Sequence, residues 1–233
     1  MKTVVIIPTY NEKANIVPLV EKVFKTIPAI HILVVDDSSP DGTADTVRVL
    51  QKQYPQLSLL VRKEKAGLGK AYINAFEHVL ADSDVEFVVM MDADHSHDPM
   101  YLKAMLAQST THDVVIGSRY VKQGGTQGWE WWRIILSRYG NRYCRLVTRM
   151  PVSDCTGGFN VIRADILRTI DFSAFDLSGY AFIMELKYRL HLAGARFAEV
   201  PIVFKNRLEG ESKISSHIIS EGIIAPWKMI TRR

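Results

Sequence analysis

The sequence has no long apolar run, which argues against a chain that crosses a membrane. A transmembrane helix needs about 20 consecutive apolar residues, and no segment of these 233 residues reaches that length. The apolar run in the opening MKTVVIIPTYNE is too short for the core of a signal peptide, because polar residues interrupt it at once. We therefore expect neither a transmembrane helix nor a signal peptide in this chain.

Cysteine is scarce as well. Cys144 and Cys155 are the two cysteines, and they form neither a CxxC pair nor the even framework of a disulfide-stabilised secreted domain. This usage favours a reducing compartment.

Several short motifs of common enzyme classes are also absent. The chain contains neither GxxxxGK[ST] nor GxGxxG, which argues against a nucleoside triphosphatase and against a dehydrogenase. The GxSxG pattern of serine hydrolases is missing too. Charge of one sign is not in great excess, since 29 Lys and Arg stand against 25 Asp and Glu, a net charge of +4. This balance fits an anionic ligand only where the basic residues cluster.

Short β-branched runs alternate with amphipathic stretches through the first half of the chain. The runs predict strands over 3–7, 31–35, 57–61, 86–91 and 114–117. The stretches predict helices over 14–26, 41–53, 69–80 and 100–107. The less regular second half predicts an amphipathic stretch over 129–147, a helix over 181–192, a strand over 196–205 and a helix over 218–230. The alternation predicts an α/β fold whose mostly parallel sheet is covered on both faces.

Polar residues gather where four of these strands end. The segments are 8–12, 36–43, 92–97 and 118–120. Ligands of such sheets bind in the crevice at the carboxyl ends of the strands. We therefore interpret the four segments as parts of one site.

Asp92 and Asp94 alternate directly after a buried apolar run, so both carboxylates can face one point. Mg²⁺ and Mn²⁺ prefer oxygen ligands from one or two carboxylates together with substrate phosphates. The pair therefore predicts a divalent metal site, and the competing interpretation is an exposed acidic turn. Zinc is disfavoured, because His95 and His97 have no cysteine or HExxH partner.

The remaining candidates are one carboxylate and four cations. We interpret Asp37 as an acceptor for a nucleotide base or ribose, and Asp41 as a turn and capping residue. The cations lie in polar or turn-like segments and can bind phosphate oxygens. They are Arg119, Arg133, Arg207 and Lys213, and the alternative for each is a solvated surface side chain.

Six motifs occur in a characteristic order over about residues 3 to 215: PTYNE, VDDSSPDGT, DAD, GSRY, GWEWWRIILSRYGN and RLEGESK. Together they resemble the family-two glycosyltransferases of the dolichyl-phosphate (polyprenyl-phosphate) mannosyltransferase branch. The first motifs are typical of the broad superfamily, and the last two are more specific to this branch. The resemblance implies one GT-A domain over 1–233, with a Rossmann-like nucleotide-sugar-binding half over 1–120 and an acceptor-binding half over 121–233.

The resemblance also implies roles for individual residues. The guanosine part of the donor would be held by Pro8, Tyr10, Glu12, Val35 and Asp37. Asp92 and Asp94 would hold Mg²⁺ or Mn²⁺ on the diphosphate, with the Ala93 backbone nearby. The donor phosphates or mannose would contact Arg119, Arg207 and Lys213, and the acceptor phosphate would contact Arg133 and Ser137. Asp94, Arg119 and Arg133 are the candidate catalytic residues.

This chain departs from the pattern at two positions beside the metal site. Some relatives have a glutamine, a further metal ligand, where this chain has Ser96, and a serine reaches less far. Relatives commonly have leucine where His95 stands.

The implied reaction is the inverting transfer of mannose from GDP-mannose to a polyprenyl (dolichyl) phosphate. The acceptor phosphate is already anionic, so the enzyme has mainly to align two anions and stabilise the leaving diphosphate. The expected partners are GDP-mannose, the lipid acceptor, a membrane surface and a membrane-anchoring subunit or domain, but no nucleic acid. The tryptophans and arginines of 129–147, with the basic chain end, suit a peripheral protein on the cytoplasmic side of a membrane. The alternative is an ordinary helix whose aromatic side lies in the core.

Three other functions stay open at this point. The first keeps the fold and changes the donor or acceptor: a polyprenyl-phosphate glucosyltransferase using UDP-glucose, or a protein or polysaccharide glycosyltransferase. The second is a non-catalytic nucleotide- or nucleic-acid-binding protein, although the carboxylates at the strand ends would repel nucleic acid. The third is a nucleotidyltransferase, which would release pyrophosphate from a triphosphate.

Overall fold

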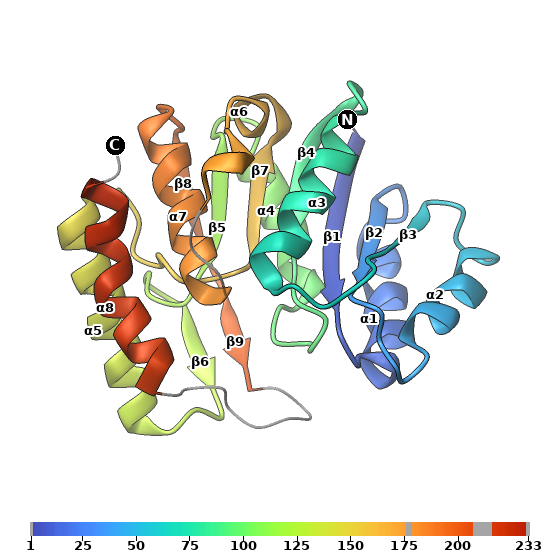
Figure 1. Cartoon of the computed structure of the whole chain (residues 1–233), viewed down its shortest axis with the longest axis horizontal. Coiled ribbons are helices and arrows are strands. Elements are labelled where there is room, and N and C mark those ends of the chain that lie inside the picture. The colour runs from blue at the N-terminus through green and yellow to red at the C-terminus, as the bar shows by residue number, and fades with distance from the viewer. Residues whose placement is uncertain (1, 176–178, 207–215, 232–233) are drawn as a thin grey trace.

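The computed structural model describes residues 2–175, 179–206 and 216–231 (Figure 1). Seven strands form one central sheet in the order β3-β2-β1-β4-β7-β5-β8. Their bounds are β1 (Lys2–Thr9), β2 (His31–Asp36), β3 (Leu57–Val61), β4 (Val85–Met90), β5 (Val114–Ser118), β7 (Asn160–Arg163) and β8 (Phe197–Pro201). Pairing is parallel except around β7, which runs antiparallel to both β4 and β5. The predicted α/β class with a mostly parallel sheet is therefore confirmed.

Two details of the strand prediction are wrong. The predicted single strand over 196–205 is two strands in different sheets, because β9 (Val203–Lys205) leaves the central sheet and pairs with β6 (Gly125–Gln127). The four-residue strand β7 and the three-residue strand β6 were not predicted. Both are too short to show a periodicity of their own, so only their pairing partners define them.

Helices cover both faces of the sheet (Figure 1). One face carries α1 (Lys13–Thr26), α2 (Thr43–Gln51), the 3-10 turn η1 (Pro99–Tyr101) and α4 (Leu102–Gln108). The other carries α3 (Leu68–Leu80), α6 (Ala164–Arg168), the 3-10 turn η2 (Phe172–Ala174) and α7 (Gly179–Leu192). Helices α5 (Trp131–Thr148) and α8 (Ser216–Thr231) lie side by side next to α7.

The apolar run of β1 explains why this strand lies inside the sheet. Val4 and Ile6 join the core on one face, and Val5 and Ile7 join the core on the other. Burying each such side chain contributes about 1.5–3 kcal/mol relative to leaving it exposed. A strand with apolar side chains on both faces must have helices packed on both faces. The polar residues that follow Ile7 therefore emerge at the carboxyl edge of the sheet.

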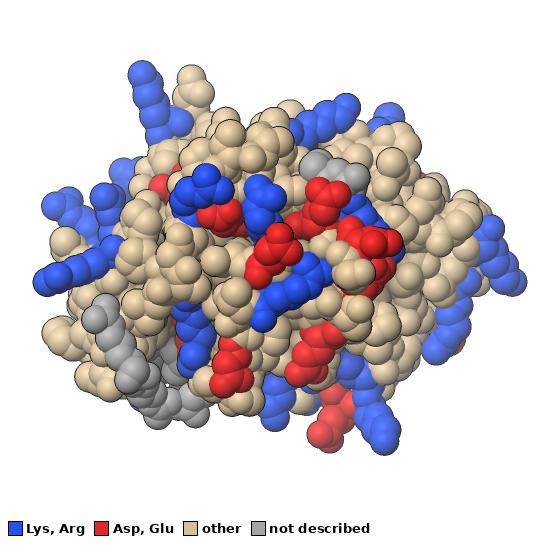
Figure 2. Space-filling model, turned by 90° about the horizontal axis from the view of Figure 1, so that it is seen from above, with Lys and Arg blue, Asp and Glu red and all other residues tan. Residues whose placement is uncertain are grey.

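The opposite edge, where the parallel strands begin, has a mixed charge. Lys2 lies 2.5 Å from Asp82, and Arg196 lies 2.9 Å from Asp113. Figure 2, which views the molecule from above, shows basic and acidic side chains interspersed over this face.

Helix α5 exposes the apolar residues that the alternative interpretation placed in the core. Trp131 is 74% exposed and Leu146 is 70% exposed, whereas Asn141, Cys144 and Thr148 are buried. The aromatic-side-in-the-core interpretation of this helix is therefore wrong. In the part of the chain that the structure describes, none of the helices combines the length and the hydropathy that a membrane span requires.

Candidate active site

The Asp36 carboxylate at the end of β2 accepts hydrogen bonds from the end of β1 and from its own loop. Its carboxylate accepts from the Thr9 hydroxyl at 2.9 Å and from the Ser39 hydroxyl and amide at 2.6 and 2.9 Å. Asp41 accepts from the amides of Thr43 and Lys13, the first residues of α2 and α1, as expected of a turn residue, although Gly42 and Glu12 occupy the N-cap positions of these helices. Asp36 therefore shapes the loop.

Asp37 is the carboxylate of this loop that faces a cation from another strand end. Arg62, directly after β3, donates from Nη1 to Asp37 Oδ1 at 2.7 Å. Burial raises the pKa of Asp37 above its ordinary value, and the Arg62 charge opposes that rise. Sequence reasoning missed Arg62, although its position at a strand end was a usable signal. Nearby, the Lys65 ammonium lies 3.6 Å from the centroid of the Tyr10 ring.

The other residues expected to hold guanosine are placed as follows. Pro8 pairs with Val35 across β1 and β2, and the Val35 side chain is wholly buried in the core. Val35 can therefore meet a ligand only through its main chain. Glu12 begins the turn into α1, where its amide donates to Thr43 and its carboxylate accepts from the Asn15 side chain at 2.7 Å.

The aspartates of the DAD motif follow β4 and differ in their surroundings. The Asp94 carboxylate is nearly buried and accepts from both the amide and the hydroxyl of Ser96. The Asp92 side chain is 30% exposed. The amide and hydroxyl of Ser96 therefore both orient the Asp94 carboxylate. The Ala93 side chain between them packs into the core.

The His97 ring contacts both the main chain and the side chain of Asp92. The Asp92 amide donates to His97 Nδ1 at 3.0 Å, so the neutral ring carries its proton on Nε2, which lies 3.7 Å from Asp92 Oδ2. The ring stacks on Phe159 with centroids 5.0 Å apart. The expected local hydrogen bond of His97 is confirmed.

The donor set at this point suits a hard cation that is also bound by its substrate. No group of three or more His, Cys, Asp or Glu side chains that could hold a metal occurs among the described residues. Asp92 and Asp94 provide two carboxylates, which is the number that Mg²⁺ uses when phosphates and water complete its shell. The residues present therefore fit Mg²⁺ or Mn²⁺ on a diphosphate.

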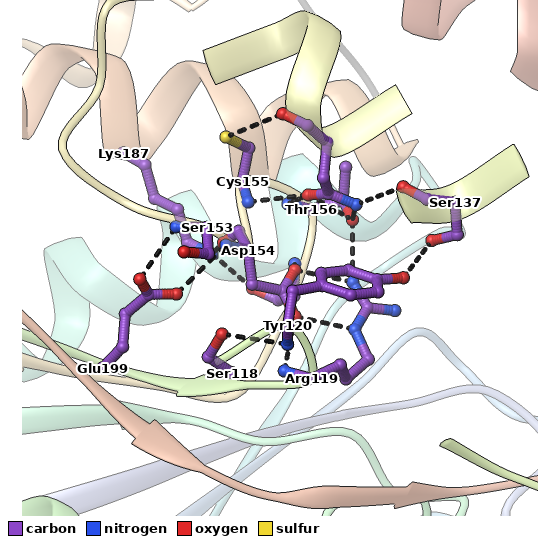
Figure 3. A network of polar contacts seen from close by, with 12 residues as sticks. Ser118, Arg119, Tyr120, Ser137, Ser153, Asp154, Cys155, Thr156, Lys187 and Glu199 are labelled. Atoms are coloured by element: carbon purple, nitrogen blue, oxygen red, sulfur yellow. Dashed lines mark hydrogen bonds and ion pairs between the residues drawn. The ribbon is translucent and has the colours of Figure 1, made fainter. Parts of the chain in front are cut away.

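Arg119 follows β5 and is held rigidly by Asp154 (Figure 3). Its main-chain amide and Nε donate to Asp154 Oδ2 at 3.0 and 2.7 Å, and its Nη2 donates to Asp154 Oδ1 at 2.7 Å and to Thr156 at 2.8 Å. Burial opposes ionisation of Asp154, but the Arg119 charge and hydrogen bonds outweigh it and lower the pKa of Asp154 to about 2. Sequence reasoning missed Asp154 because it lies 35 residues from its partner.

The residues expected at the acceptor side lie beside Arg119. Ser137 on α5 accepts from the Tyr120 hydroxyl at 2.6 Å. The Arg133 guanidinium lies over the Trp129 ring, 3.9 Å from its centroid, and the Arg119 guanidinium lies 5.7 Å from the same centroid. Two guanidinium groups therefore lie against one indole. Nε and Nη2 of Arg119 are bonded to Asp154 and Thr156, so its Nη1 is the nitrogen that can bind an anion beside Arg133.

Two predicted phosphate ligands fall in a segment that the structure does not describe. Arg207 and Lys213 lie outside the described residues. Their roles stay predictions.

Comparison with known proteins agrees with this geometry. The family model described as "Glycosyl transferase family 2" matches residues 4–171. The chain is 41% identical over 230 residues to polyprenol monophosphomannose synthase of Mycolicibacterium smegmatis, covering 97% of this chain and 86% of that protein. It is 39% identical over 234 residues to undecaprenyl-phosphate mannosyltransferase of Micrococcus luteus, covering 100% of this chain and 96% of that protein.

Solved structures share the fold at low sequence identity. A mannosyltransferase from Pyrobaculum calidifontis, in complex with GDP-Man and Mn²⁺, matches with a TM-score of 0.67 at 18% identity, over 100% of this chain and 64% of that one. Mannosyl-3-phosphoglycerate synthase from Rubrobacter xylanophilus matches with a TM-score of 0.69 at 17% identity, over 100% of this chain and 74% of that one.

The chain belongs to glycosyltransferase family 2. It is a glycosyltransferase with a GT-A-like fold, as its motifs predicted.

Proposed function

We propose that this glycosyltransferase moves mannose from GDP-mannose to a polyprenyl phosphate, with inversion at the anomeric carbon. The observation that carries the proposal is the pair of guanidinium groups, Arg119 and Arg133, on one indole. The names of the two curated relatives support a lipid-phosphate acceptor and mannose as the sugar. The neighbour structure with bound GDP-Man and Mn²⁺ supports the donor and a divalent cation.

Each group then has one task. Tyr10 and Asp37 bind the nucleoside, and Asp92 and Asp94 hold Mg²⁺ or Mn²⁺. The cation, when bound, offsets negative charge on the leaving diphosphate. Arg119 binds that diphosphate from the other side, and Arg133 with Ser137 binds the acceptor phosphate.

A catalytic base is not required in this scheme. The acceptor phosphate is anionic at neutral pH and can attack the anomeric carbon directly. The nearby carboxylate of Asp154 is unsuited to take a proton, because it accepts from Arg119 and from the Gly157 amide at 2.8 Å and its pKa is lowered to about 2. Alignment of the two anions is therefore the main catalytic contribution of the protein.

Transfer of radiolabelled sugar to a short polyprenyl phosphate tests the proposal. GDP-mannose and UDP-glucose are supplied separately, with Mg²⁺, with Mn²⁺ and with chelator. We expect metal-dependent, lipid-extractable label from GDP-mannose and a β-linked product. Label from UDP-glucose alone would identify a glucosyltransferase, and an α-linked product would contradict in-line displacement. Release of pyrophosphate in a separate incubation with GTP and a sugar 1-phosphate would indicate a nucleotidyltransferase.

We also propose that α5 and α8 rest on the membrane that contains the acceptor. Trp131, Ile135, Tyr139 and Leu146 recur at helical spacing on the exposed face of α5. This helix has four arginines and no acidic residue. Trp and Tyr beside arginine are typical of a helix that lies in an anionic lipid interface.

Helix α8 extends the same apolar face. Ile223, Ile224 and Trp227 are exposed. Trp227 donates through Nε1 to the Tyr143 hydroxyl of α5 at 2.6 Å, and that hydroxyl donates to the Ile223 carbonyl at 2.9 Å. The two helices therefore present one continuous surface.

Sedimentation with anionic phospholipid vesicles tests this surface. Replacing Trp131 and Trp227 by alanine is expected to weaken binding at least tenfold, because each aromatic ring loses about 1.5–3 kcal/mol of apolar burial. Val49→Ala is the control, since Val49 is 58% exposed on α2, away from these helices. If the chain with both tryptophans replaced binds vesicles as tightly as the unmodified chain, the proposed surface is excluded.

A further inference from the structure

Lys187 is a fully buried cation that the scheme above does not use. It lies on α7 with 1% of its surface exposed. Its ammonium donates to the main-chain oxygens of Asp154 and Gly157, each at 2.8 Å (Figure 3). Burying an ammonium group costs several kcal/mol, whereas an apolar side chain of similar length would leave both buried carbonyls without this donor. What these two hydrogen bonds hold in place therefore decides the role of Lys187.

The two carbonyls belong to a turn over 153–158, whose main-chain groups are bonded to three other elements. Glu199 on β8 accepts from the amides of Ser153 and Asp154 at 2.8 and 3.1 Å. Asn141 on α5 accepts from the amides of Cys155 and Thr156 at 2.7 and 3.1 Å. Lys187 supplies the remaining contact, from α7, to the turn's carbonyls.

Both ends of this turn border the active site. At one end the Asp154 carboxylate holds three donor groups of Arg119. At the other end Gly158 lies against the metal-binding strand end, since a Cβ on Gly158 would be 3.4 Å from His97 and 3.7 Å from Asp92. A shift of the turn would therefore displace the guanidinium group and disturb the wall beside Asp92.

We propose that Lys187 is a positioning residue of the active site. Its ammonium fixes the turn over 154–157, and the turn holds the Arg119 guanidinium in the orientation that binds the donor diphosphate. The catalytic consequence rests on the proposed function. The orientation of Arg119 does not, because it can be measured without any substrate.

The charged groups around Lys187 define how it should respond to pH. Asp154 and Glu199 favour the ammonium form, Arg119 disfavours it, and the thiols of Cys144 and Cys155 are the other titratable groups nearby. Burial lowers the pKa of Lys187 to about 8, although Asp154 and Cys155 oppose that shift. The ammonium is therefore present below about pH 8 and is lost as the pH rises through that value.

Hydrogen exchange of the Arg119 Nε–H, followed by NMR on the free protein, tests the positioning. The signal is assigned by its loss in Arg119→Lys. We expect Lys187→Met to lower the protection of this proton at least tenfold, equivalent to about 1.4 kcal/mol. Leu190→Ala is the control: it opens a cavity in the same helix at another fully buried position and should leave the protection unchanged.

A second test uses the unmodified chain and therefore needs no substitution at a buried position. Protection of Arg119 Nε–H, corrected for intrinsic exchange, should fall as the pH rises through about 8, and Cys144→Ala should leave that fall in place. Protection that is unchanged in folded Lys187→Met, or that does not vary with pH in the unmodified chain, would overturn the proposal.

Kinetics then separate this inference from the proposed function. Lys187→Met should lower kcat for mannose transfer at least tenfold and change the KM for the lipid acceptor less than twofold. If the unmodified chain transfers no mannose while the exchange results are as expected, the proposed function fails and the positioning role stands. If transfer occurs and Lys187→Met leaves both kcat and its pH profile unaltered, the positioning role fails alone.

Discussion

Replacing Asp154 by asparagine should destabilise the protein severely. The change preserves volume but leaves the Arg119 guanidinium, which is 7% exposed, without a counter-ion. Removing one partner of a buried ion pair costs about 3–5 kcal/mol, out of a total stability of about 5–15 kcal/mol for a typical domain. Urea unfolding followed by circular dichroism measures the loss.

A double-mutant cycle separates the pair from its surroundings. Arg119→Met and Asp154→Leu should each be destabilising alone, and the two together should cost less than the sum of the single changes, because the guanidinium and its carboxylate are then removed as a pair. A loss below about 1 kcal/mol for Asp154→Asn would refute the reasoning, since exposed ion pairs contribute that little.

The same carboxylate gives the stability a defined pH dependence. Its pKa is lowered to about 2 in the folded protein, against about 3.9 in an unfolded chain. Its contribution, about 2–3 kcal/mol by linkage, is complete above about pH 5 and is lost progressively as the pH falls to about 2. Unfolding free energies measured between pH 5 and pH 2 should show this component in the unmodified chain, and Asp154→Asn should lack it.

Three further predictions concern the donor side and the core. Asp94→Asn should abolish turnover and weaken Mn²⁺ binding in the presence of GDP, measured by calorimetry, with an unchanged circular dichroism spectrum; full activity would exclude the metal site. Asp37→Asn should raise the KM for GDP-mannose about tenfold, as expected for one charge-assisted hydrogen bond, and leave the KM for the acceptor unchanged. Gly69→Ala should destabilise by about 1–3 kcal/mol through overpacking, because its Cβ would lie 3.0 Å from the Phe182 ring; an unchanged melting temperature would show that Phe182 moves aside freely.

The sequence by itself determined the local part of this architecture. The uninterrupted apolar run of β1 requires burial on both faces, so a parallel sheet covered by helices follows from it. The same reasoning located Asp37, Asp92 and Asp94, because polar residues that directly follow a buried strand must emerge at its carboxyl end. These conclusions needed only the period of the side chains and the position of each strand's last residue.

Tertiary structure decided what depends on partners far apart in the chain. The insertion of β7 between β4 and β5 brings the turn over 153–158 beneath Arg119, and strand order of this kind leaves no trace in local periodicity. The contact of Arg62 with Asp37 likewise needs the neighbouring ends of β2 and β3.

Tertiary contacts also decide which side of α5 is buried. Its sequence shows an apolar and a polar side, but a helix can bury either one. In this protein the buried side carries Asn141, Cys144 and Thr148, and Asn141 satisfies the amides of Cys155 and Thr156. The large apolar side chains are left outward together with three of the four arginines. Amphipathicity is a local property of the chain, whereas the choice of the buried face depends on which polar groups its tertiary neighbours leave unsatisfied.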